Sequence, residues 1–435
     1  MNYYSTNKKS KKVSFKEAVI KGIADDGGLF MPEFFPILPK KFVYEINEHS
    51  FHEISYKIAA SFIEDEIPSL TLKAIIERAI NFDAPLVDLN EDTNILELFH
   101  GPTLAFKDFG ARFMAEIFSY FSQENKQDIN ILVATSGDTG SAVANGFFNM
   151  EGIKVYLLYP SKKVSHIQEM QLTTLGGNIT ALEVEGTFDD CQKLVKQAFL
   201  DNELTRSVFL SSANSINIAR LLPQSFYYFN AYKHLKNKNK SLIFSVPSGN
   251  FGNLTGGIIA KKIGLPVDKF IAAVNANDVF PIYLNTGKFI PKSSVKTISN
   301  AMDVGNPSNF YRILDLYEND WKKLKNEISS YSFSDSLTKE AIKKIYYEYN
   351  YLMDPHGAVG FLALDEYLNK YRTEQFNAVI LETAHPSKFA DIMEEVIKEN
   401  IKIPERLESC LHKEKKSIKI SNEYDDFKNY LLNQQ

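Results

Sequence analysis

The sequence predicts an α/β fold in which a parallel sheet follows a small, mainly helical N-terminal domain. Beyond residue 90, short apolar segments such as NILELF, IKVYLLYP and FIAAVN alternate with segments of helical length. This alternation is typical of parallel strands whose sheet is covered by helices on both faces. The chain has 435 residues, which at about 150 residues per domain corresponds to two or three domains.

The first 90 residues differ from the rest of the chain in their sequence pattern, because apolar strand-like segments do not alternate with helical ones there. They contain a Gly-Gly turn, the proline-rich run MPEFFPILP and two helical patterns, FHEISYKIAASFI and TLKAIIERAINF. Pro68 lies between the two patterns, so we expect two separate helices. At the other end, SIKISNEYDDFKNYLLNQQ predicts a surface strand and a helix. The predicted division of the chain is into residues 1–90, 91–400 and 401–435.

Charge and cysteine content restrict the classes of function. The formal net charge is −5 and 44% of the residues are hydrophobic, which excludes wholesale disorder and gives no reason to expect a nucleic-acid partner. No apolar run approaches the roughly 20 residues that cross a bilayer, and no secretory signal is recognisable. Cys191 and Cys410 are too few for a disulfide framework or a cysteine-rich zinc site. We therefore expect a soluble, globular protein of the cytoplasm that does not associate with membranes.

The first of three candidate loops is HGPTLAFKDFG, where Lys107 lies among Leu104, Phe106 and Phe109. Apolar surroundings disfavour the charged form of a lysine, which lowers its pKa and makes its amine nucleophilic. A lysine that forms a Schiff base needs these properties. The spacing alone favours the simpler interpretation, which is a surface lysine at the start of a helix.

The second candidate loop is VATSGDTGSAVANG, which places Ser136, Asp138 and Thr139 around two glycines where a strand passes into a helix. Backbone N–H groups at a helix N-terminus, together with hydroxyl groups, can bind a carboxylate or a phosphate. An ordinary tight turn with a helix cap requires the same residue types. Both interpretations remain open from the residues alone.

The third candidate loop is SVPSGNFGNLTGG, in which Gly249 and Gly252 allow a ligand to approach the backbone closely. The loop also precedes a predicted helix, as a phosphate-binding loop does. It matches neither G-x-x-x-x-G-K-[ST] nor G-x-G-x-x-G. A nucleoside triphosphate or a dinucleotide therefore loses most of its support as the ligand, and a phosphate-bearing cofactor of another kind remains.

Other catalytic and metal-binding patterns fail on inspection. The chain has no G-x-S-x-G motif, so the common hydrolase signature is absent. DLNEDTN resembles the start of a calcium loop, but Thr93 stands where glycine is required. His49 and His52 lack a third ligand, and we predict no metal site.

Six motifs occur in the order in which they are found in the threonine synthase family: HGPTLAFKDFG, ATSGDTGSA, SANSINIAR, SVPSGNFGNLTGG, SNAMDVGNPSN and TAHPSKF. VSFKEAVIKGIADDGGLFMP also resembles the N-terminal signature of the longer branch of that family. The resemblance covers roughly residues 3 to 430. It implies the parallel-sheet fold of the tryptophan-synthase β-like pyridoxal-phosphate enzymes, in which two subdomains form the catalytic region and a further domain precedes them.

The resemblance also implies a role for individual residues. Lys107 matches the lysine that forms a Schiff base with pyridoxal phosphate, and Thr383 matches the residue that faces the pyridine nitrogen. The loop that holds the cofactor phosphate corresponds to Gly249, Asn250, Phe251 and Asn253. The family often has aspartate at position 253, and asparagine here removes a negative charge beside the phosphate.

Two further segments correspond to substrate-binding parts of the family. The loop that holds the substrate carboxylate beside the cofactor ring corresponds to Ser136, Asp138 and Thr139. The segment that lines the substrate phosphate site corresponds to Asn214, Ser215, Asn217 and Arg220.

The implied reaction is the last step of threonine biosynthesis, which converts O-phospho-L-homoserine and water to L-threonine and phosphate. Lys107 would move protons at the α and β carbons, and the released phosphate would orient the water. The expected assembly is a monomer or a homodimer. Two alternatives are a serine or threonine dehydratase of the same fold and a binding protein without chemistry. The long N-terminal signature argues against the first, and the presence of Lys107 argues against the second.

Overall fold

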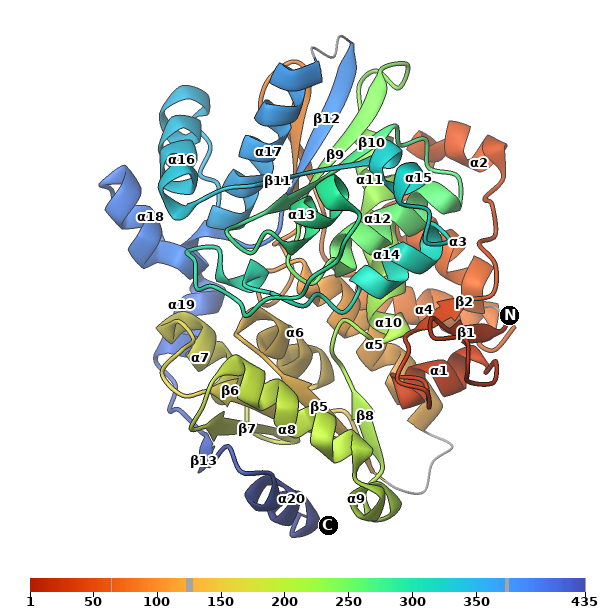
Figure 1. Ribbon diagram of the computed structural model, residues 1–435, viewed down its shortest axis with the longest axis vertical. Helices are drawn as coiled ribbons and strands as arrows, with labels where there is room; N and C mark the ends of the chain where they lie inside the picture. The colour runs from red at the N-terminus through yellow and green to blue at the C-terminus, as the bar shows by residue number, and fades with distance from the viewer. Residues whose placement is uncertain (64, 123–127, 372–374, 435) are drawn as a thin grey trace.

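The computed structural model describes residues 1–63, 65–122, 128–371 and 375–434. Within these ranges the strands form sheets of two, six and five strands. Figure 1 shows the six-stranded sheet in the upper part of the molecule and the five-stranded sheet in the lower part, and we call them the large and the small sheet. The predicted α/β fold with parallel strands is confirmed, and the strands are divided between two sheets.

The large sheet has the order β11-β10-β9-β12-β4-β3. Its neighbouring strands are parallel, except that β3 is antiparallel to β4. Its strands are β3 (Leu86–Asp88), β4 (Thr93–Glu97), β9 (Ser241–Pro247), β10 (Lys269–Val274), β11 (Ile328–Ser332) and β12 (Phe376–Glu382). The central strands are continuous apolar runs because both of their faces are covered.

The small sheet has the order β13-β7-β6-β5-β8 and is parallel. Its strands are β5 (Ile129–Ala134), β6 (Ile153–Pro160), β7 (Ile179–Val184), β8 (Leu210–Ser212) and β13 (Ile418–Ile420). Helices of this part are α5 (Lys107–Ser122), α6 (Asp138–Phe147), α7 (His166–Thr173), α8 (Phe188–Leu200) and α9 (Asn202–Ser207). Side-chain caps at Ser165 and Thr187 fix where α7 and α8 begin.

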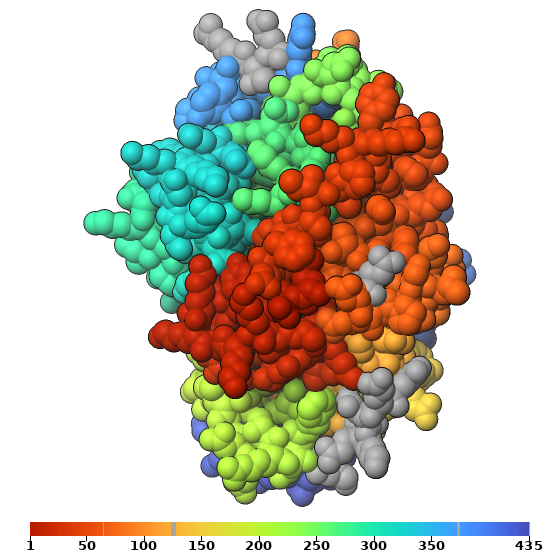
Figure 2. Space-filling view, turned by 90° about the vertical axis from the view of Figure 1, so that its right-hand side faces the viewer, coloured from red at the N-terminus to blue at the C-terminus, as the bar shows by residue number. Residues whose placement is uncertain are grey.

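The N-terminal segment packs across the junction of the two larger parts. It contains β1 (Tyr3–Ser5), β2 (Phe30–Pro32), α1 (Phe15–Lys21), α2 (Lys40–Tyr44), η1 (Ile46–Glu48), α3 (Phe51–Ile63) and α4 (Ser69–Ala79). The two expected helices are α3 and α4, and Pro68 immediately precedes α4. Figure 2 shows this segment, in red and orange, lying against both the upper and the lower part.

The remaining helices mostly surround the large sheet. They are α10 (Ile218–Leu221), η2 (Leu222–Ser225), α11 (Phe226–His234), α12 (Gly252–Lys262), α13 (Val279–Thr286), η3 (Asn300–Met302), α14 (Phe310–Leu316), α15 (Trp321–Glu327), α16 (Asp335–Tyr349), α17 (Pro355–Tyr371), η4 (Pro386–Phe389), α18 (Ala390–Ile397) and α19 (Glu405–Leu411). A large apolar core joins the N-terminal segment to both sheets, and a second core lies beneath α16, α17 and α18. Among the described residues, no helix is long and apolar enough to cross a membrane.

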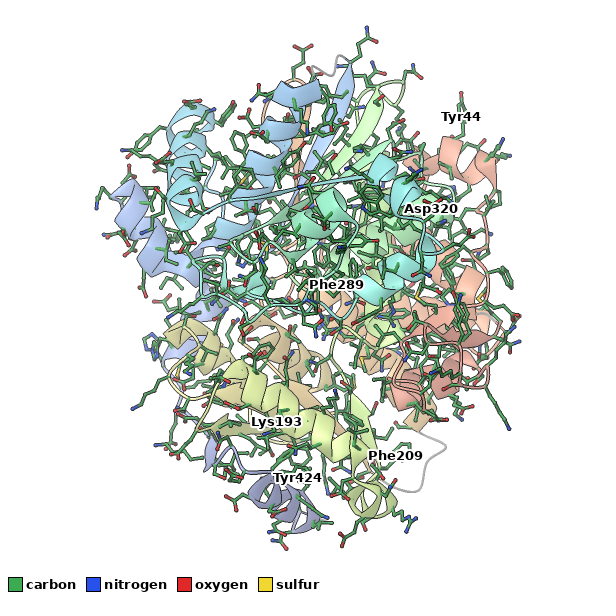
Figure 3. The ribbon with its side chains drawn as sticks, in the orientation of Figure 1. Tyr44, Lys193, Phe209, Phe289, Asp320 and Tyr424 are labelled. Atoms are coloured by element: carbon green, nitrogen blue, oxygen red, sulfur yellow. The ribbon has the colours of Figure 1, made fainter. Side chains whose placement is uncertain are left out.

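The C-terminal segment forms the predicted strand and helix, β13 and α20 (Tyr424–Leu432). Phe427 and Leu431 of α20 are buried in the third core, beside α8 and the small sheet. The Tyr424 hydroxyl donates to Asp201 Oδ2 at 2.8 Å, and Figure 3 shows Tyr424 just below the helix that carries Lys193. The end of the chain therefore completes the small sheet and covers one of its helices.

Candidate active site

A cavity of about 530 Å³ lies at the carboxyl ends of strands from both sheets. Parallel sheets place ligands at this end of their strands, because the strand–helix loops converge there. The candidate residues that line the cavity are Lys107, Ser136, Thr139, Asn214, Ser215, Arg220, Gly249, Asn250, Phe251, Asn253 and Thr383. Asp138 and Asn217 are not among the lining residues.

Lys107 is the first residue of α5, and it lines the cavity. Burial lowers its pKa to about 8, although the carboxylate of Asp138 acts in the opposite direction. The preceding loop is fixed to the end of β12, because the Phe106 N–H donates to the Thr383 carbonyl oxygen at 2.9 Å. The Asp108 carboxylate accepts from the Thr103 N–H at 2.8 Å and closes the turn before the helix.

Asp138 lies behind the wall of the cavity in a buried ion pair. Its Oδ1 is 2.7 Å from Lys388 Nζ and also accepts from Gln168 Nε2 at 3.1 Å. The nearby ammonium groups of Lys388 and Lys107 hold the pKa of this carboxyl far below its usual range, despite its burial. The carboxylate is therefore ionised and already occupied. A direct role in holding a substrate carboxylate does not follow from this position.

The loop that precedes α6 is organised by Thr135. Its hydroxyl oxygen accepts from the N–H groups of Gly137 at 3.0 Å and Gly140 at 2.8 Å. Gly137 has φ of +136° and no room for a Cβ, which would lie 2.5 Å from Gln168 Cδ. This geometry brings Ser136 and Thr139 to the cavity.

The loop that precedes α12 is held from outside by side chains on distant segments. Asn250 Nδ2 donates to Ser215 Oγ at 2.7 Å, and Asn250 Oδ1 accepts from the Ser308 N–H at 2.6 Å. A Cβ on Gly249 would lie 2.6 Å from Met302 Cα, so only glycine fits there. At Gly252 the nearest atoms would be 3.5 Å away, which leaves a space at the N-terminus of α12 that a side chain would fill.

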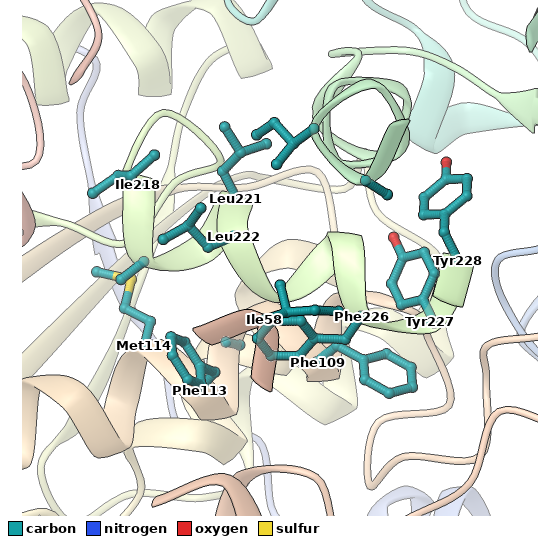
Figure 4. Close-up of a cluster of buried hydrophobic side chains, with 14 of the residues drawn as sticks. Ile58, Phe109, Phe113, Met114, Ile218, Leu221, Leu222, Phe226, Tyr227 and Tyr228 are labelled. Carbon is teal, nitrogen blue, oxygen red and sulfur yellow. The ribbon is translucent and has the colours of Figure 1, made fainter. Parts of the chain in front are cut away.

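Asn253 is oriented by two buried tyrosines. Its Oδ1 accepts from the Tyr227 hydroxyl at 2.7 Å and from the Tyr228 hydroxyl at 2.8 Å. Figure 4 shows the two rings side by side with their hydroxyl oxygens on the same side. Asn253 Nδ2 is buried at the cavity and has no hydrogen-bond partner among the described residues. A donor is thus left for a ligand.

Thr383 follows β12 and is backed by a buried acidic network. Glu382 Oε1 accepts from the Asp354 N–H at 2.6 Å, and burial raises the pKa of the Glu382 carboxyl well above its usual value.

His356 lines the cavity, and its Nε2 accepts from the Ala301 N–H at 3.2 Å. Its Nδ1 is 2.6 Å from Asp354 Oδ1, which fixes the ring as the Nδ1–H tautomer.

Three family models match the chain in sequence order. The model for the N terminus of threonine synthase matches residues 2–80, that for pyridoxal-phosphate dependent enzymes matches 84–382, and that for the C-terminal part of threonine synthase matches 357–431. Threonine synthases of Buchnera aphidicola subsp. Baizongia pistaciae and Haemophilus influenzae are each 44% identical to the chain, over 99% of its length and 100% of theirs. The chain belongs to the threonine synthase family.

Solved structures agree with this membership of the threonine synthase family. Threonine synthase from Escherichia coli superimposes with a TM-score of 0.93 at 40% identity, and each chain is covered completely. Threonine synthase from Brucella melitensis with bound pyridoxal phosphate gives 0.92 at 31% identity, covering 100% of this chain and 99% of that one. The protein is therefore a pyridoxal-phosphate-dependent lyase of the tryptophan-synthase β-like fold.

The residues at the cavity fit pyridoxal phosphate. A buried donor, Asn253 Nδ2, has no partner among the described residues and suits an anionic group. Gly252 leaves space at a helix N-terminus, where free N–H groups favour a phosphate. Lys107 supplies an amine with a lowered pKa close by. This set matches a ligand that carries both an aldehyde and a phosphate.

Asn217 joins two segments of the fold through hydrogen bonds and does not line the cavity. Its Nδ2 donates to the carbonyl oxygens of Val19 at 2.8 Å and Ser212 at 3.2 Å, and its Oδ1 caps α10. It therefore joins the N-terminal segment to the wall of the cavity without lining it. Its neighbour Arg220 does line it, and burial lowers the pKa of that guanidinium to about 10.

Some residues that belong to the site or support it were not predicted from the sequence. His356 comes from DPHGAV, a segment that carried no recognised pattern, and Lys388 lies inside TAHPSKF without having been singled out. Tyr227 and Tyr228 come from FYYFNAY, which reads as ordinary apolar helix. Of these residues, only Lys388 lies in one of the six family motifs, so only Lys388 could have been found from the sequence.

Proposed function

We propose that this cavity converts O-phospho-L-homoserine and water to L-threonine and phosphate, with Lys107 as the proton-transferring base. The observation that carries the proposal is the pairing of an amine of lowered pKa with a phosphate-type loop across one cavity. Pyridoxal phosphate, when bound, supplies an electron sink for the carbon atoms next to the substrate nitrogen. Membership of the threonine synthase family supports the choice of substrate.

Lys107 is suited to accept and return protons at two neighbouring carbons. An amine whose pKa is about 8 is partly unprotonated near neutral pH and remains a strong base. Its four-carbon side chain lets Nζ reach both the α and the β carbon from one anchor on α5. Asp138, one layer behind, raises the pKa of Lys107 and so keeps the amine able to hold a proton between the transfers.

We assign the substrate anions to opposite walls of the cavity. Ser136 and Thr139, at the start of α6, are proposed to hold the carboxylate through hydroxyl and backbone N–H groups. Asn214, Ser215 and Arg220 are proposed to hold the phosphate, because Arg220 supplies the positive charge on that wall. The phosphate, once released there, would orient the water that adds at the β carbon.

The cofactor contacts are proposed from the same geometry. The residues proposed for the cofactor phosphate are Gly249, Asn250, Phe251 and Asn253. Thr383 is proposed to face the pyridine nitrogen with a neutral hydroxyl. The raised pKa of the Glu382 carboxyl supports this arrangement, because a neutral acid adds no negative charge behind Thr383.

We also propose the three-part division 1–90, 91–400 and 401–435, a cytoplasmic location and a monomeric or homodimeric assembly. Two free cysteines, Cys191 and Cys410, support a reducing compartment. Light scattering coupled to size-exclusion chromatography distinguishes the assemblies.

The reaction is tested by measuring products from O-phospho-L-homoserine with the cofactor-loaded enzyme. Threonine and inorganic phosphate should form in equal amounts. Formation of 2-oxobutyrate and ammonia instead of threonine would show that the cavity eliminates without adding water, as a dehydratase does.

A further inference from the structure

A second cavity, of about 500 Å³, lies where three parts of the chain meet, and it shares no lining residue with the active-site cavity. The N-terminal segment contributes Asn81 and Phe82. The helices below them contribute Arg112 from α5 and Gln171 from α7, and the C-terminal segment contributes Arg406 from α19. Nothing in the proposed reaction uses this cavity.

The lining of this cavity is positively charged. Arg112, Arg406 and Lys413 line it, and no aspartate or glutamate is among the described residues that do so. His100 also lines it, but its ring is engaged with Glu97 at 2.7 Å. Two further acids, Asp108 and Glu116, interact with the charge of Arg112 from outside the lining. Each already has a partner, because Asp108 accepts from the Thr103 N–H and Glu116 pairs with Arg78 at 2.7 Å.

The two guanidinium groups are oriented by neutral atoms. Arg112 Nε donates to the Ala79 carbonyl oxygen at 2.9 Å, and Arg406 Nη1 donates to the His100 carbonyl oxygen at 3.1 Å. These backbone carbonyls hold the side chains in place, and neither guanidinium forms an ion pair with a carboxylate among the described residues. Guanidinium groups that are fixed in this way and lack a direct ion pair are suited to bind carboxylates.

Gln171 contributes a buried hydrogen-bond acceptor, which calls for a donor on the ligand rather than an anion. Its side chain is only 7% exposed, and Nε2 donates to the Thr103 carbonyl oxygen at 3.3 Å. Its Oε1 is buried and has no hydrogen-bond partner among the described residues. An unpaired buried acceptor is unfavourable, so a ligand that brings an N–H donor to this point is favoured.

We propose that this second cavity binds an α-amino acid with an acidic side chain. The ammonium group donates to Gln171 Oε1, and the two carboxylates pair with Arg112, Arg406 and Lys413. A second carboxylate is included because three cations exceed what one carboxylate can balance. This proposal is independent of the reaction assigned to the active site.

The test is calorimetric titration of the cofactor-loaded enzyme with L-glutamate. One molecule should bind per chain, and Arg406→Gln with Lys413→Gln should weaken binding by at least about tenfold. Lys416→Gln, an exposed lysine on the same segment outside the cavity, is the matched control and should leave the affinity unchanged. Unchanged binding in the double variant, or no binding at millimolar glutamate, would overturn the proposal.

Two further titrations test the chemistry of the ligand. Glutarate, which lacks the ammonium group, should bind at least about tenfold more weakly than L-glutamate. Gln171→Leu should weaken L-glutamate binding and leave glutarate binding unchanged. If inorganic phosphate or glutarate binds as tightly as L-glutamate, the cavity is a general anion site and the amino-acid assignment is wrong.

Amino acids can also enter the active site, so binding in the second cavity must be distinguished from binding in the active site. Glutamate bound in the second cavity should leave the visible spectrum of the cofactor unchanged. Binding that shifts this spectrum, and that O-phospho-L-homoserine displaces competitively, would place the glutamate in the active site and overturn the proposal.

Discussion

The loop before α6 and the loop before α12 both follow a buried parallel strand, contain glycine and open a helix at the same cavity. They differ in the charge of their first helical turn. Asp138 is the first residue of α6, whereas α12 begins with Gly252 and Asn253 and has no acid in its first turn. The positive end of α6 is thus opposed by its own carboxylate, while that of α12 remains available to an anion.

The two loops also differ in how they are held. Thr135 organises the α6 loop from within, through hydrogen bonds to Gly137 and Gly140. The α12 loop depends on Ser215 and the backbone of Ser308, which are distant in sequence. Loops of similar composition can therefore carry different roles, and we expect the residue in the first helical turn to decide which one binds phosphate.

The largest expected effect comes from removing the amine that lies between the two loops. Lys107→Ala should lower phosphate release from O-phospho-L-homoserine by at least about a thousandfold, a barrier increase of about 4 kcal/mol, because the base is lost. The α12 loop should still bind pyridoxal phosphate non-covalently, which dialysis and absorbance measure. Lys196→Ala, an exposed lysine on α8, is the control and should keep full activity. Borohydride reduction followed by peptide mapping should label Lys107, and labelling at another lysine would contradict the assignment.

Asp138→Asn removes the negative charge in the first turn of α6, which is the feature that distinguishes this loop from the α12 loop. It leaves Lys388 buried without a counter-charge and should destabilise the fold by about 3–5 kcal/mol in denaturant unfolding. Lys388→Met in the same chain should recover part of that loss, because the unpaired charge is removed. A double variant no more stable than Asp138→Asn would argue against the ion pair.

Asp138→Asn should also shift the pH dependence. The free amine of Lys107 must be unprotonated to act as base, so kcat should rise with pH and level off above about 8. Because Asp138 raises the pKa of Lys107, its neutralisation should move this rise to lower pH. A shift to higher pH would contradict the electrostatic role of Asp138.

Thr383→Asp should slow threonine formation by about tenfold or more, which corresponds to roughly 1.4 kcal/mol. A carboxylate opposite the pyridine nitrogen favours its protonated form, and the visible spectrum with substrate should change accordingly. Thr383→Ser keeps a hydroxyl and serves as the matched control. Normal activity with an unchanged spectrum in Thr383→Asp would mean that Thr383 is not the partner of the nitrogen.

Gly252→Val should weaken pyridoxal phosphate binding by several-fold while the fold survives, because a side chain at this position enters open space at the loop. Gly249→Ala should instead lower the melting temperature, since its Cβ would clash with the backbone of Met302. Cofactor titration and thermal unfolding separate the two effects. Unchanged cofactor affinity in Gly252→Val would place the phosphate elsewhere.

The smallest effect is expected from Asn253→Asp, which gives the first turn of α12 the acid that α6 has. Repulsion of the cofactor phosphate should reduce affinity by about two- to threefold at low salt. Aspartate and asparagine have nearly the same shape, so this change isolates the effect of charge, and added salt should reduce it. Tighter cofactor binding in Asn253→Asp would show that charge in the first turn does not decide between the loops.

The sequence predicted much of the fold because its signals are local. The apolar runs that became β5, β6, β9, β10 and β12 and the periodic segments that became α3 and α4 carry their pattern within a few residues. The division into two sheets was not visible in the residues, because strand order depends on pairings between distant segments. The strands β8 and β11 were also missed, since the three residues of β8 and the polar sequence ISSYS of β11 give no alternation to detect.

The candidate site was predicted where motifs contribute side chains directly to the cavity, as Lys107 and Asn250 do. Asp138 and Asn217 could not be separated from true lining residues, because hydrogen bonding to Lys388 and Val19 arises only from tertiary packing. His356 escaped for the same reason. Its importance rests on contacts with Asp354 and the Ala301 backbone rather than on any local pattern.

The order of strands in the large sheet has a consequence for how the chain is made. β4 ends at Glu97 and pairs with β12, which begins at Phe376, so well over half of the chain separates these neighbours. The strands β5 to β8 of the small sheet are contiguous in sequence and can pair as they leave the ribosome. A nascent chain therefore carries β4 without β12 until synthesis is almost complete, and its open strand edge is exposed to misassembly during that interval.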